Sequence, residues 1–359
     1  MYNERISLFP QTDAEFDKLV EHNKAFAASC VEKSGKLTYH MDTASVARDF
    51  EAVRKATGSE KFNYLGFSYG TFIGYQYAQL FPDKIGSMVL DAVANHADSE
   101  ISMLVTETET YEDEFVRFAE WASKSNESVL AGQDVAALFD FLVQKADESP
   151  LALGSTPGSR ANITGDEILF GFQGTLVSKA AGLGAGWPAL SQGLALALGG
   201  NATALASLAP VAVAGDVEEN SGLFAGVAVG RMDWTHAARD VAAMKYKDQL
   251  TTNWAPHTKG HSQGRTIQSL CIGWPAPVNP PQQILLETKT PILLVNSYHD
   301  AECSYTWAVA VQAQIPNSVL LTRNGDRHTS YFEEGETTAA MNAFLVNGTM
   351  PSLNAVLQT

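Results

Sequence analysis

Residues 62–80 constrain the fold of this chain more than any other stretch. A short apolar strand, Phe62–Leu65, leads into the pentapeptide Gly66-Phe67-Ser68-Tyr69-Gly70, and a helical run follows to Leu80. A G-x-S-x-G sequence between a strand and a helix is typical of a sharp turn that lifts a serine hydroxyl out of a parallel sheet. The pattern predicts Ser68 as a nucleophile and the N–H of Tyr69 as a donor to developing negative charge.

Helices and strands alternate around this turn. A helix is expected at Thr43–Thr57, before the Ser68 strand, and a second strand at Ser87–Leu90. The alternation returns near the C-terminus, where strands are expected at Pro291–Asn296 and Ser318–Thr322. Strands separated by helices form parallel sheets with right-handed crossovers, so we expect an α/β fold.

The middle of the chain has a different character. Residues 96–285 contain amphipathic helical patterns, including Glu107–Trp121, and no strand pattern comparable to those outside. We therefore predict that residues 1–95 and 286–359 form an α/β core and that residues 96–285 form a large, mostly helical cap.

A nucleophilic serine needs a base, and the base needs a carboxylate that orients it. Ser68, Asp300 and His328 each follow a predicted strand, and they occur in the chain order Ser, acid, His. Asp91, which ends the second strand, is the alternative acid. Two competing residues lie in the C-terminal loops. We interpret His299 as a surface or packing residue, and Asp326 as a residue that caps a turn and is too close in the chain to orient His328.

The acidic composition excludes several classes of partner. The formal net charge is −16 at pH 7, which disfavours nucleic acid and anionic membranes as partners. No apolar run is long enough to span a bilayer. The three cysteines have no metal-ligand spacing, and their pairing stays open: Cys30, Cys271 and Cys303. The sequence implies no metal and no organic cofactor.

Several of these segments together resemble one family. The stretches 43–71 and 81–91, then Cys271-Ile272-Gly273-Trp274-Pro275, the strand at Pro291 and Gly325-Asp326-Arg327-His328 are similar to the tripeptidyl aminopeptidase and proline iminopeptidase group of α/β-hydrolases. The resemblance implies an α/β-hydrolase fold with Ser68 as nucleophile, Asp300 as acid and His328 as base. It also implies a peptide substrate bound through its N-terminus.

The chain departs from the family in two places. Members have a Gly-rich H/N-x-G-G-P-G stretch before the nucleophile, which supplies a second oxyanion donor, and no such stretch precedes Ser68. The retained strands would be the last four of the fold, with the Ser68 strand at an exposed edge. After the acid, members usually have Thr-Pro where this chain has Ala301-Glu302-Cys303-Ser304.

Three functions remain open from the sequence. The first is a serine hydrolase of acyl bonds, by resemblance an aminopeptidase-like peptidase, and the second an esterase, lactonase or acyl-transfer enzyme on a small metabolite. The third is a truncated or split hydrolase that is inactive alone, binds only, or needs a partner chain with the missing strands. The expected location is cytoplasmic, or secreted if a signal peptide precedes this sequence; four N-x-S/T sequons fit the second case: Asn126, Asn162, Asn201 and Asn347.

Overall fold

The computed structural model describes residues 6–154, 161–180, 186–208 and 221–358, and its centre is a five-stranded sheet. Every neighbouring pair of strands is parallel, and the spatial order follows the chain. The strands are β1 (Phe62–Phe67), β2 (Ile85–Asp91), β5 (Ile292–His299), β6 (Ser318–Asp326) and β7 (Val356–Gln358). The predicted parallel α/β sheet is confirmed, and β7 is a strand that the sequence analysis did not include.

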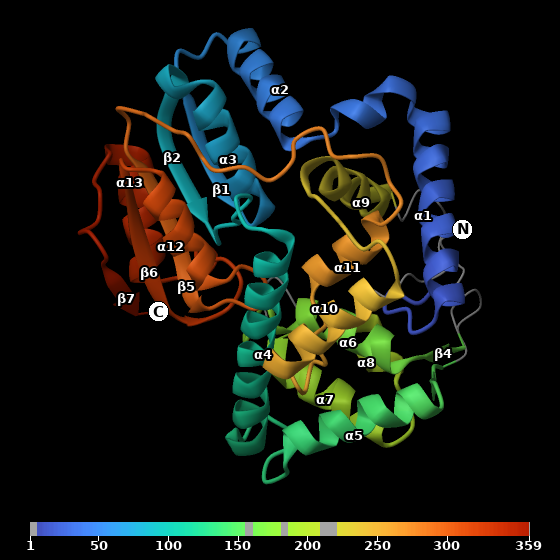
Figure 1. Cartoon of the computed structure of the whole chain (residues 1–359). Coiled ribbons are helices and arrows are strands. Elements are labelled where there is room, and N and C mark those ends of the chain that lie inside the picture. The colour runs from blue at the N-terminus through green and yellow to red at the C-terminus, as the bar shows by residue number, and fades with distance from the viewer. Residues whose placement is uncertain (1–5, 155–160, 181–185, 209–220, 359) are drawn as a thin grey trace.

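Helices cover both faces of this sheet (Figure 1). Along β5, Ile292 and Leu294 face one core and Leu293 and Val295 face the other, as the twofold periodicity of a strand requires. The first core includes side chains from α2 (Thr43–Ala56), α3 (Tyr69–Leu80) and α12 (Tyr305–Gln314). The second core is closed by α13 (Glu336–Asn347) through Met341 and Phe344.

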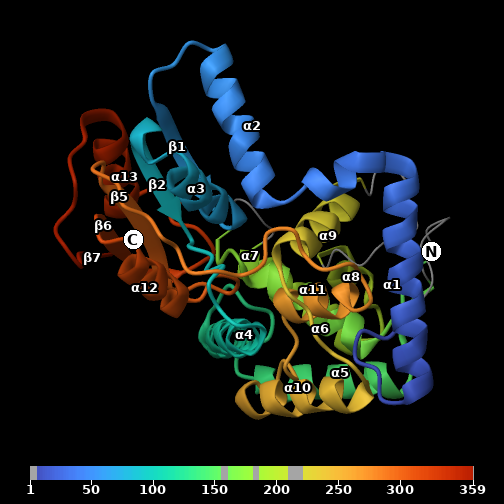
Figure 2. The ribbon, with the colours of Figure 1, turned by 45° about the horizontal axis from the view of Figure 1, so that its top comes forward.

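Between β2 and β5 the chain forms a helical body, which Figures 1 and 2 show gathered beside the sheet. Its centre is an apolar cluster that includes Phe115, Phe139, Phe172 and Trp187. The elements of this body are α4 (Glu100–Lys124), α5 (Val135–Glu148), β3 (Leu151–Ala152), β4 (Asn162–Ile163), α6 (Gly165–Leu176), α7 (Gly186–Leu198), α8 (Thr203–Leu208), α9 (Ser221–Asp233), α10 (Val241–Trp254) and α11 (Gln263–Cys271).

The N-terminal helix packs on the helical body, away from the sheet. Phe16 and Leu19 of α1 (Asp13–Ser34) contact a cluster with Met244 of α10 and Ile272 after α11. Figure 2 shows α1 along the outer flank of that body. A short 3-10 segment, η1 (Gly35–His40), then leads to α2; a second, η2 (Pro82–Lys84), joins α3 to β2. The α1 helix therefore does not contribute to the two cores of the sheet, although it lies within residues 1–95.

Among the described residues, β1 pairs with β2 alone and is an edge of the sheet. The sequence analysis expected this position for the strand that carries Ser68. No helix within the described part of the chain has the length and apolarity needed to cross a membrane.

Candidate active site

Ser68 lies in the turn between β1 and α3 and has a strained backbone. Its φ of 54° and ψ of −125° fall in a region that residues with a Cβ rarely adopt. A conformation of this kind costs on the order of 1–3 kcal/mol. The turn is held by the Ser68 N–H, which donates to the Asp91 carbonyl at 2.9 Å, and by the Thr71 hydroxyl, which donates to the Ser68 carbonyl at 2.7 Å.

The glycines of the turn have unequal steric roles. A Cβ on Gly66 would lie 2.6 Å from the Gly70 carbonyl oxygen and 2.5 Å from the Tyr64 ring. A Cβ on Gly70 would meet only the Tyr64 hydroxyl, at 3.3 Å. Close packing of strand against helix therefore demands glycine at position 66, while position 70 is merely tight.

The N-terminus of α3 points at the same turn. Tyr69 is the first residue of α3, so its N–H has no acceptor within the helix and can donate to an anion beside Ser68. The Tyr69 phenol is directed elsewhere, since its hydroxyl donates to Asp233 of α9 at 2.7 Å.

Asp300 and His328 are brought together beyond the carboxyl ends of β5 and β6. The imidazole Nδ1 of His328 lies 2.8 Å from Asp300 Oδ1 and 3.0 Å from Oδ2. Asp300 is buried, and its Oδ1 also accepts the backbone N–H groups of Glu302 and Cys303, each at 2.9 Å. The carboxylate is therefore fixed by its own loop and orients the imidazole.

The His328 loop is itself constrained. Arg327 and Thr329, which flank His328, have φ angles of 118° and 66°. Arg323 of β6 is buried and donates to the carbonyl of Arg327 at 2.9 Å, and the Ser297 hydroxyl donates to the same carbonyl at 2.8 Å. These contacts determine where the imidazole can lie.

Asp91, the alternative acid, has a different set of partners. Its Oδ2 accepts the backbone N–H groups of Ser330 at 2.7 Å and Tyr331 at 2.8 Å. It therefore ties β2 to the loop just after His328, without a hydrogen bond to the imidazole. Burial raises the pKa of Asp91 to about 6, and the two N–H donors oppose this rise.

The second ring nitrogen of His328 has an unexpected neighbour. Its Nε2 lies 3.2 Å from Oε2 of Glu302, a residue that the sequence analysis noted only as a departure from the family. Burial disfavours the imidazolium, but the Asp300 and Glu302 carboxylates outweigh burial and raise the pKa of His328 to about 9. Among the described residues, no hydrogen bond joins the Ser68 hydroxyl to His328.

The thiol of Cys303 lies near the nucleophile. Burial and the neighbouring carboxylates raise the pKa of Cys303 well above its usual value, while a hydrogen bond with the Ser68 hydroxyl acts in the opposite direction. All three cysteines are free thiols, so the pairing that the sequence left open does not occur here: Cys30, Cys271 and Cys303.

The two competing loop residues have other partners. His299 Nδ1 lies 2.7 Å from Asp113 of α4. Asp326 accepts from Lys179 at 2.8 Å and pairs with Arg117. Neither residue forms a hydrogen bond with His328 or Ser68 in the described part of the chain. The interpretation of Asp326 as a turn residue is wrong, because Asp326 ends β6 and its side chain is only 8% exposed between Arg117 and Lys179.

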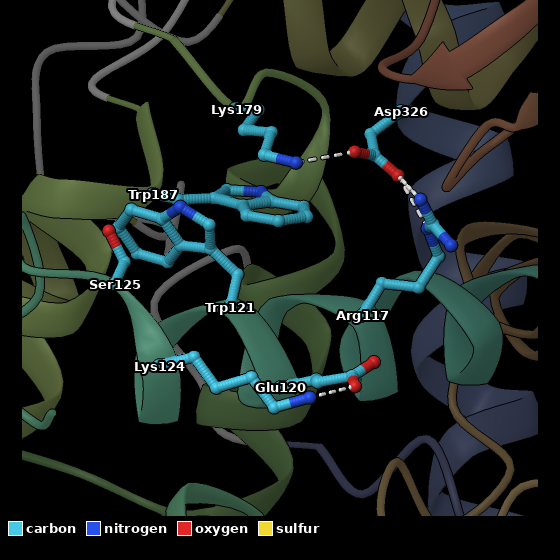
Figure 3. Close-up of a pocket in the computed structure, with 8 residues that line it drawn as sticks. All are labelled: Arg117, Glu120, Trp121, Lys124, Ser125, Lys179, Trp187 and Asp326. Carbon is cyan, nitrogen blue, oxygen red and sulfur yellow. Dashed lines mark hydrogen bonds and ion pairs between the residues drawn. The ribbon is translucent and has the colours of Figure 1, made fainter. Parts of the chain in front are cut away.

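Asp326 also lines a pocket of about 370 Å³ between α4 and the chain around α7. Figure 3 shows the indoles of Trp121 and Trp187 close together in this pocket, and Lys179 reaching across to Asp326. Ser68 and His328 do not line it. The pocket therefore lies beside the His328 loop and is separate from Ser68.

A buried carboxylate that sequence reasoning missed joins the helical body to the turn. Asp233, the last residue of α9, accepts from the Thr43 N–H at 3.0 Å, from the Tyr69 hydroxyl at 2.7 Å and from the Asn279 amide at 2.6 Å. No local pattern around Asp233 indicates this role, because its partners come from three distant segments. Within the described residues, no group of His, Cys, Asp and Glu is arranged to hold a metal ion.

This chain is similar in sequence to known protein families over much of its length. Residues 26–170 match a family model described as alpha/beta hydrolase fold, and residues 257–356 match one described as TAP-like protein. Serine protease Hip1 of Mycobacterium tuberculosis is 28% identical over 366 residues, which cover 98% of this chain and 69% of that protein. Tripeptidyl aminopeptidase of Streptomyces lividans is 27% identical over 332 residues, which cover 87% of this chain and 57% of that protein. The chain thus spans only part of the length of these relatives.

Proposed function

We propose that this chain, which belongs to the α/β-hydrolase family and to its TAP-like group, is a serine hydrolase that cleaves acyl bonds. Ser68 would attack the carbonyl carbon, and His328 would accept the serine proton through Nε2. Asp300 would hold the imidazole through Nδ1, and the Tyr69 N–H would donate to the oxyanion.

One observation carries this proposal. Ser68 has the φ of 54° that a nucleophile turn requires, and it follows β1 at the carboxyl ends of the strands, where Asp300 Oδ1 and His328 Nδ1 lie 2.8 Å apart. A strained backbone persists only where the surrounding structure imposes it, and such strain gathers at functional sites. The presence of a strained serine, an acid and a base at the carboxyl ends of the same sheet supports acyl chemistry over a purely structural turn.

In the proposed mechanism the proton moves from Ser68 to His328 and then to the leaving group. As the Ser68 oxygen bonds to the acyl carbon, its proton passes to His328 Nε2, and the imidazolium later gives it to the leaving group. Water then attacks the acyl-serine, with His328 again as base. The charge on the carbonyl oxygen would be met by the Tyr69 N–H, and each such donor is worth roughly 10²- to 10³-fold in rate.

For the substrate we propose a peptide cleaved near its N-terminus, since curated relatives include a serine protease and a tripeptidyl aminopeptidase. The test is a substrate panel of tripeptidyl p-nitroanilides, N-blocked versions of the same peptides, p-nitrophenyl esters and lactones. The proposal predicts Ser68-dependent turnover that favours the free tripeptides. Turnover of esters or lactones alone would assign the chain to small acyl substrates instead.

A split hydrolase is the second candidate, and the edge position of β1 favours it. An edge strand presents unpaired backbone groups on which a partner strand can add. The reactive serine would then be completed by a second polypeptide. Size-exclusion chromatography of the folded chain, combined with the panel above, separates this candidate from a chain that is active alone.

A further inference from the structure

The base of the proposed site lies between two carboxylates. Asp300 Oδ1 lies 2.8 Å from Nδ1 of His328, and Glu302 Oε2 lies 3.2 Å from Nε2 of the same ring. Nε2 is the atom that must face the Ser68 hydroxyl if His328 is to accept its proton. Glu302 therefore lies beside the ring nitrogen that the nucleophile needs.

We propose that Glu302 is a competing partner of the base: its carboxylate pairs with Nε2 of His328 in the resting site and must move away before the Ser68 proton can be transferred. This inference rests on the proposed role of His328 as general base. Glu302 would be a positioning residue that controls when the base is free.

Glu302 has a second partner to which its side chain can turn. Its Oε1 already accepts from the Gln263 side-chain amide at 2.5 Å, at the first residue of α11. The backbone of Gln263 is held in turn, since its N–H donates to the Gln173 side chain at 2.8 Å. A rotation of the carboxylate toward α11 would break the pairing with Nε2 and keep the hydrogen bond from Gln263. Without the second carboxylate beside it the imidazolium is less stable, so Nε2 can lose its proton to water and then accept the Ser68 proton.

Only the side chain of Glu302 is free to make this rotation. Its backbone N–H is fixed by Asp300 Oδ1 at 2.9 Å, and the next residue, Cys303, is bound to the same oxygen. The side chain retains 17% of its exposure, compared with none for Asp300. The backbone of the Asp300–Cys303 loop is therefore fixed, and the Glu302 carboxylate is the group that can change its position.

The surrounding charges favour an ion pair between a protonated His328 and the Glu302 carboxylate over a neutral His328. The other charged groups that act on His328 or Glu302 are all carboxyl groups, namely Asp300, Asp91 and Glu107. The Cys303 thiol beside Glu302 stays neutral because its pKa is raised. Arg323 lies behind the His328 loop and binds the carbonyl of Arg327. Burial raises the pKa of Glu302, and His328 opposes that rise. With a pKa of about 9, His328 is mainly the imidazolium at neutral pH, so proton acceptance should increase with pH.

The direct test measures the ring of His328 and does not require turnover. The chain of residues 1–359 with Ser68→Ala is selectively labelled with ¹⁵N-histidine and titrated by NMR, and the His328 signal is assigned with His328→Gln. Glu302→Gln should lower the His328 pKa by about 1–3 units, the size expected when an adjacent opposite charge is removed. Glu107→Gln is the matched control, because it removes a buried carboxylate near Glu302 that does not contact His328; it should give less than half of that change.

An unchanged His328 midpoint in Glu302→Gln, or a change no larger than that of Glu107→Gln, would overturn the proposal. The functional arm follows labelling of Ser68 by a fluorophosphonate at pH 7 in the chain with Glu302→Ala. Each unit by which the His328 pKa falls should speed labelling by up to about tenfold. Labelling of Glu302→Ala as slow as that of His328→Ala would contradict a competing role. If the wild-type chain labels at no pH, the proposed hydrolase fails, while the NMR midpoint still decides the Glu302 contact.

Discussion

Replacement of Asp91 by asparagine separates the two carboxylates that the sequence offered as the acid. In the structure Asp91 binds the N–H groups of Ser330 and Tyr331, whereas Asp300 binds His328. Asp91→Asn keeps an oxygen for those N–H groups and removes the negative charge. The variant should therefore change the pH dependence of stability and leave the reactivity of Ser68 within about tenfold of wild type, because the orienting carboxylate of the triad stays in place.

The magnitude follows from the pKa of Asp91, which burial raises to about 6 from 3.8. At 1.36 kcal/mol per unit, this difference corresponds to about 3 kcal/mol. Because the folded carboxyl keeps its proton after the unfolded one has lost it, the wild-type chain loses this stability as the pH rises from about 4 to above 6. Asp91→Asn has no such proton and avoids the loss.

The assay is urea unfolding followed by tryptophan fluorescence at a series of pH values from 4 to 7.5. The free energy of unfolding of wild type should fall by about 3 kcal/mol relative to Asp91→Asn across that range. Asp49→Asn, an exposed aspartate on α2, is the control and should run parallel to wild type. Parallel curves for Asp91→Asn, or a divergence of the opposite sign, would refute the assignment of a buried, proton-holding Asp91.

The same variants test which carboxylate orients the base. Asp300→Asn should lower Ser68 reactivity by on the order of 10⁴, the loss seen when a triad histidine is left without its orienting carboxylate. If Asp91→Asn were the inactive variant and Asp300→Asn kept its reactivity, Asp91 at the end of β2 would be the orienting carboxylate.

Two further variants test the turn and its support. Gly66→Ala should lower the free energy of unfolding by about 1–3 kcal/mol through overpacking and abolish Ser68 labelling. The control is Gly174→Ala on α6, where a Cβ would meet nothing within 4 Å, and it should be neutral or stabilise the chain. Equal losses of stability in the two variants would argue against a steric role for Gly66. Asp233→Ala should lower the free energy of unfolding by about 3 kcal/mol or more in urea denaturation, since Tyr69 and Asn279 lose a charged acceptor. A loss of less than about 1 kcal/mol would show that Asp233 does not join α9 to the turn.

The sequence predicted best what depends on local backbone geometry. The turn at Ser68 follows from two glycines at fixed spacing between a strand and a helix, and its positive φ is present in the structure. The structure also places Asp300 beside His328, because each residue follows a parallel strand and the carboxyl ends of these strands lie on one side of the sheet. Their catalytic roles stay predictions that the variants above examine.

Features that depend on packing between distant segments were not predictable. Glu302 contacts His328 because two loops approach, and nothing in its sequence neighbourhood specifies the rotamer that does so. Asp233 gathers partners from α2, α3 and the segment at Asn279, which are distant in the chain. The strand β7 has three residues and is largely exposed, so it lacks the alternating apolar pattern by which a strand is recognised.

The central claim is that Ser68, activated by His328 and Asp300, is a working nucleophile in this chain alone. Its most direct test is fluorophosphonate labelling of the purified, folded chain at pH 9, with the modified residue identified by mass spectrometry. We predict modification at Ser68 that is lost in Ser68→Ala and His328→Ala and retained in Asp91→Asn. A folded chain that carries no label on Ser68, or labels equally well without His328, would contradict it.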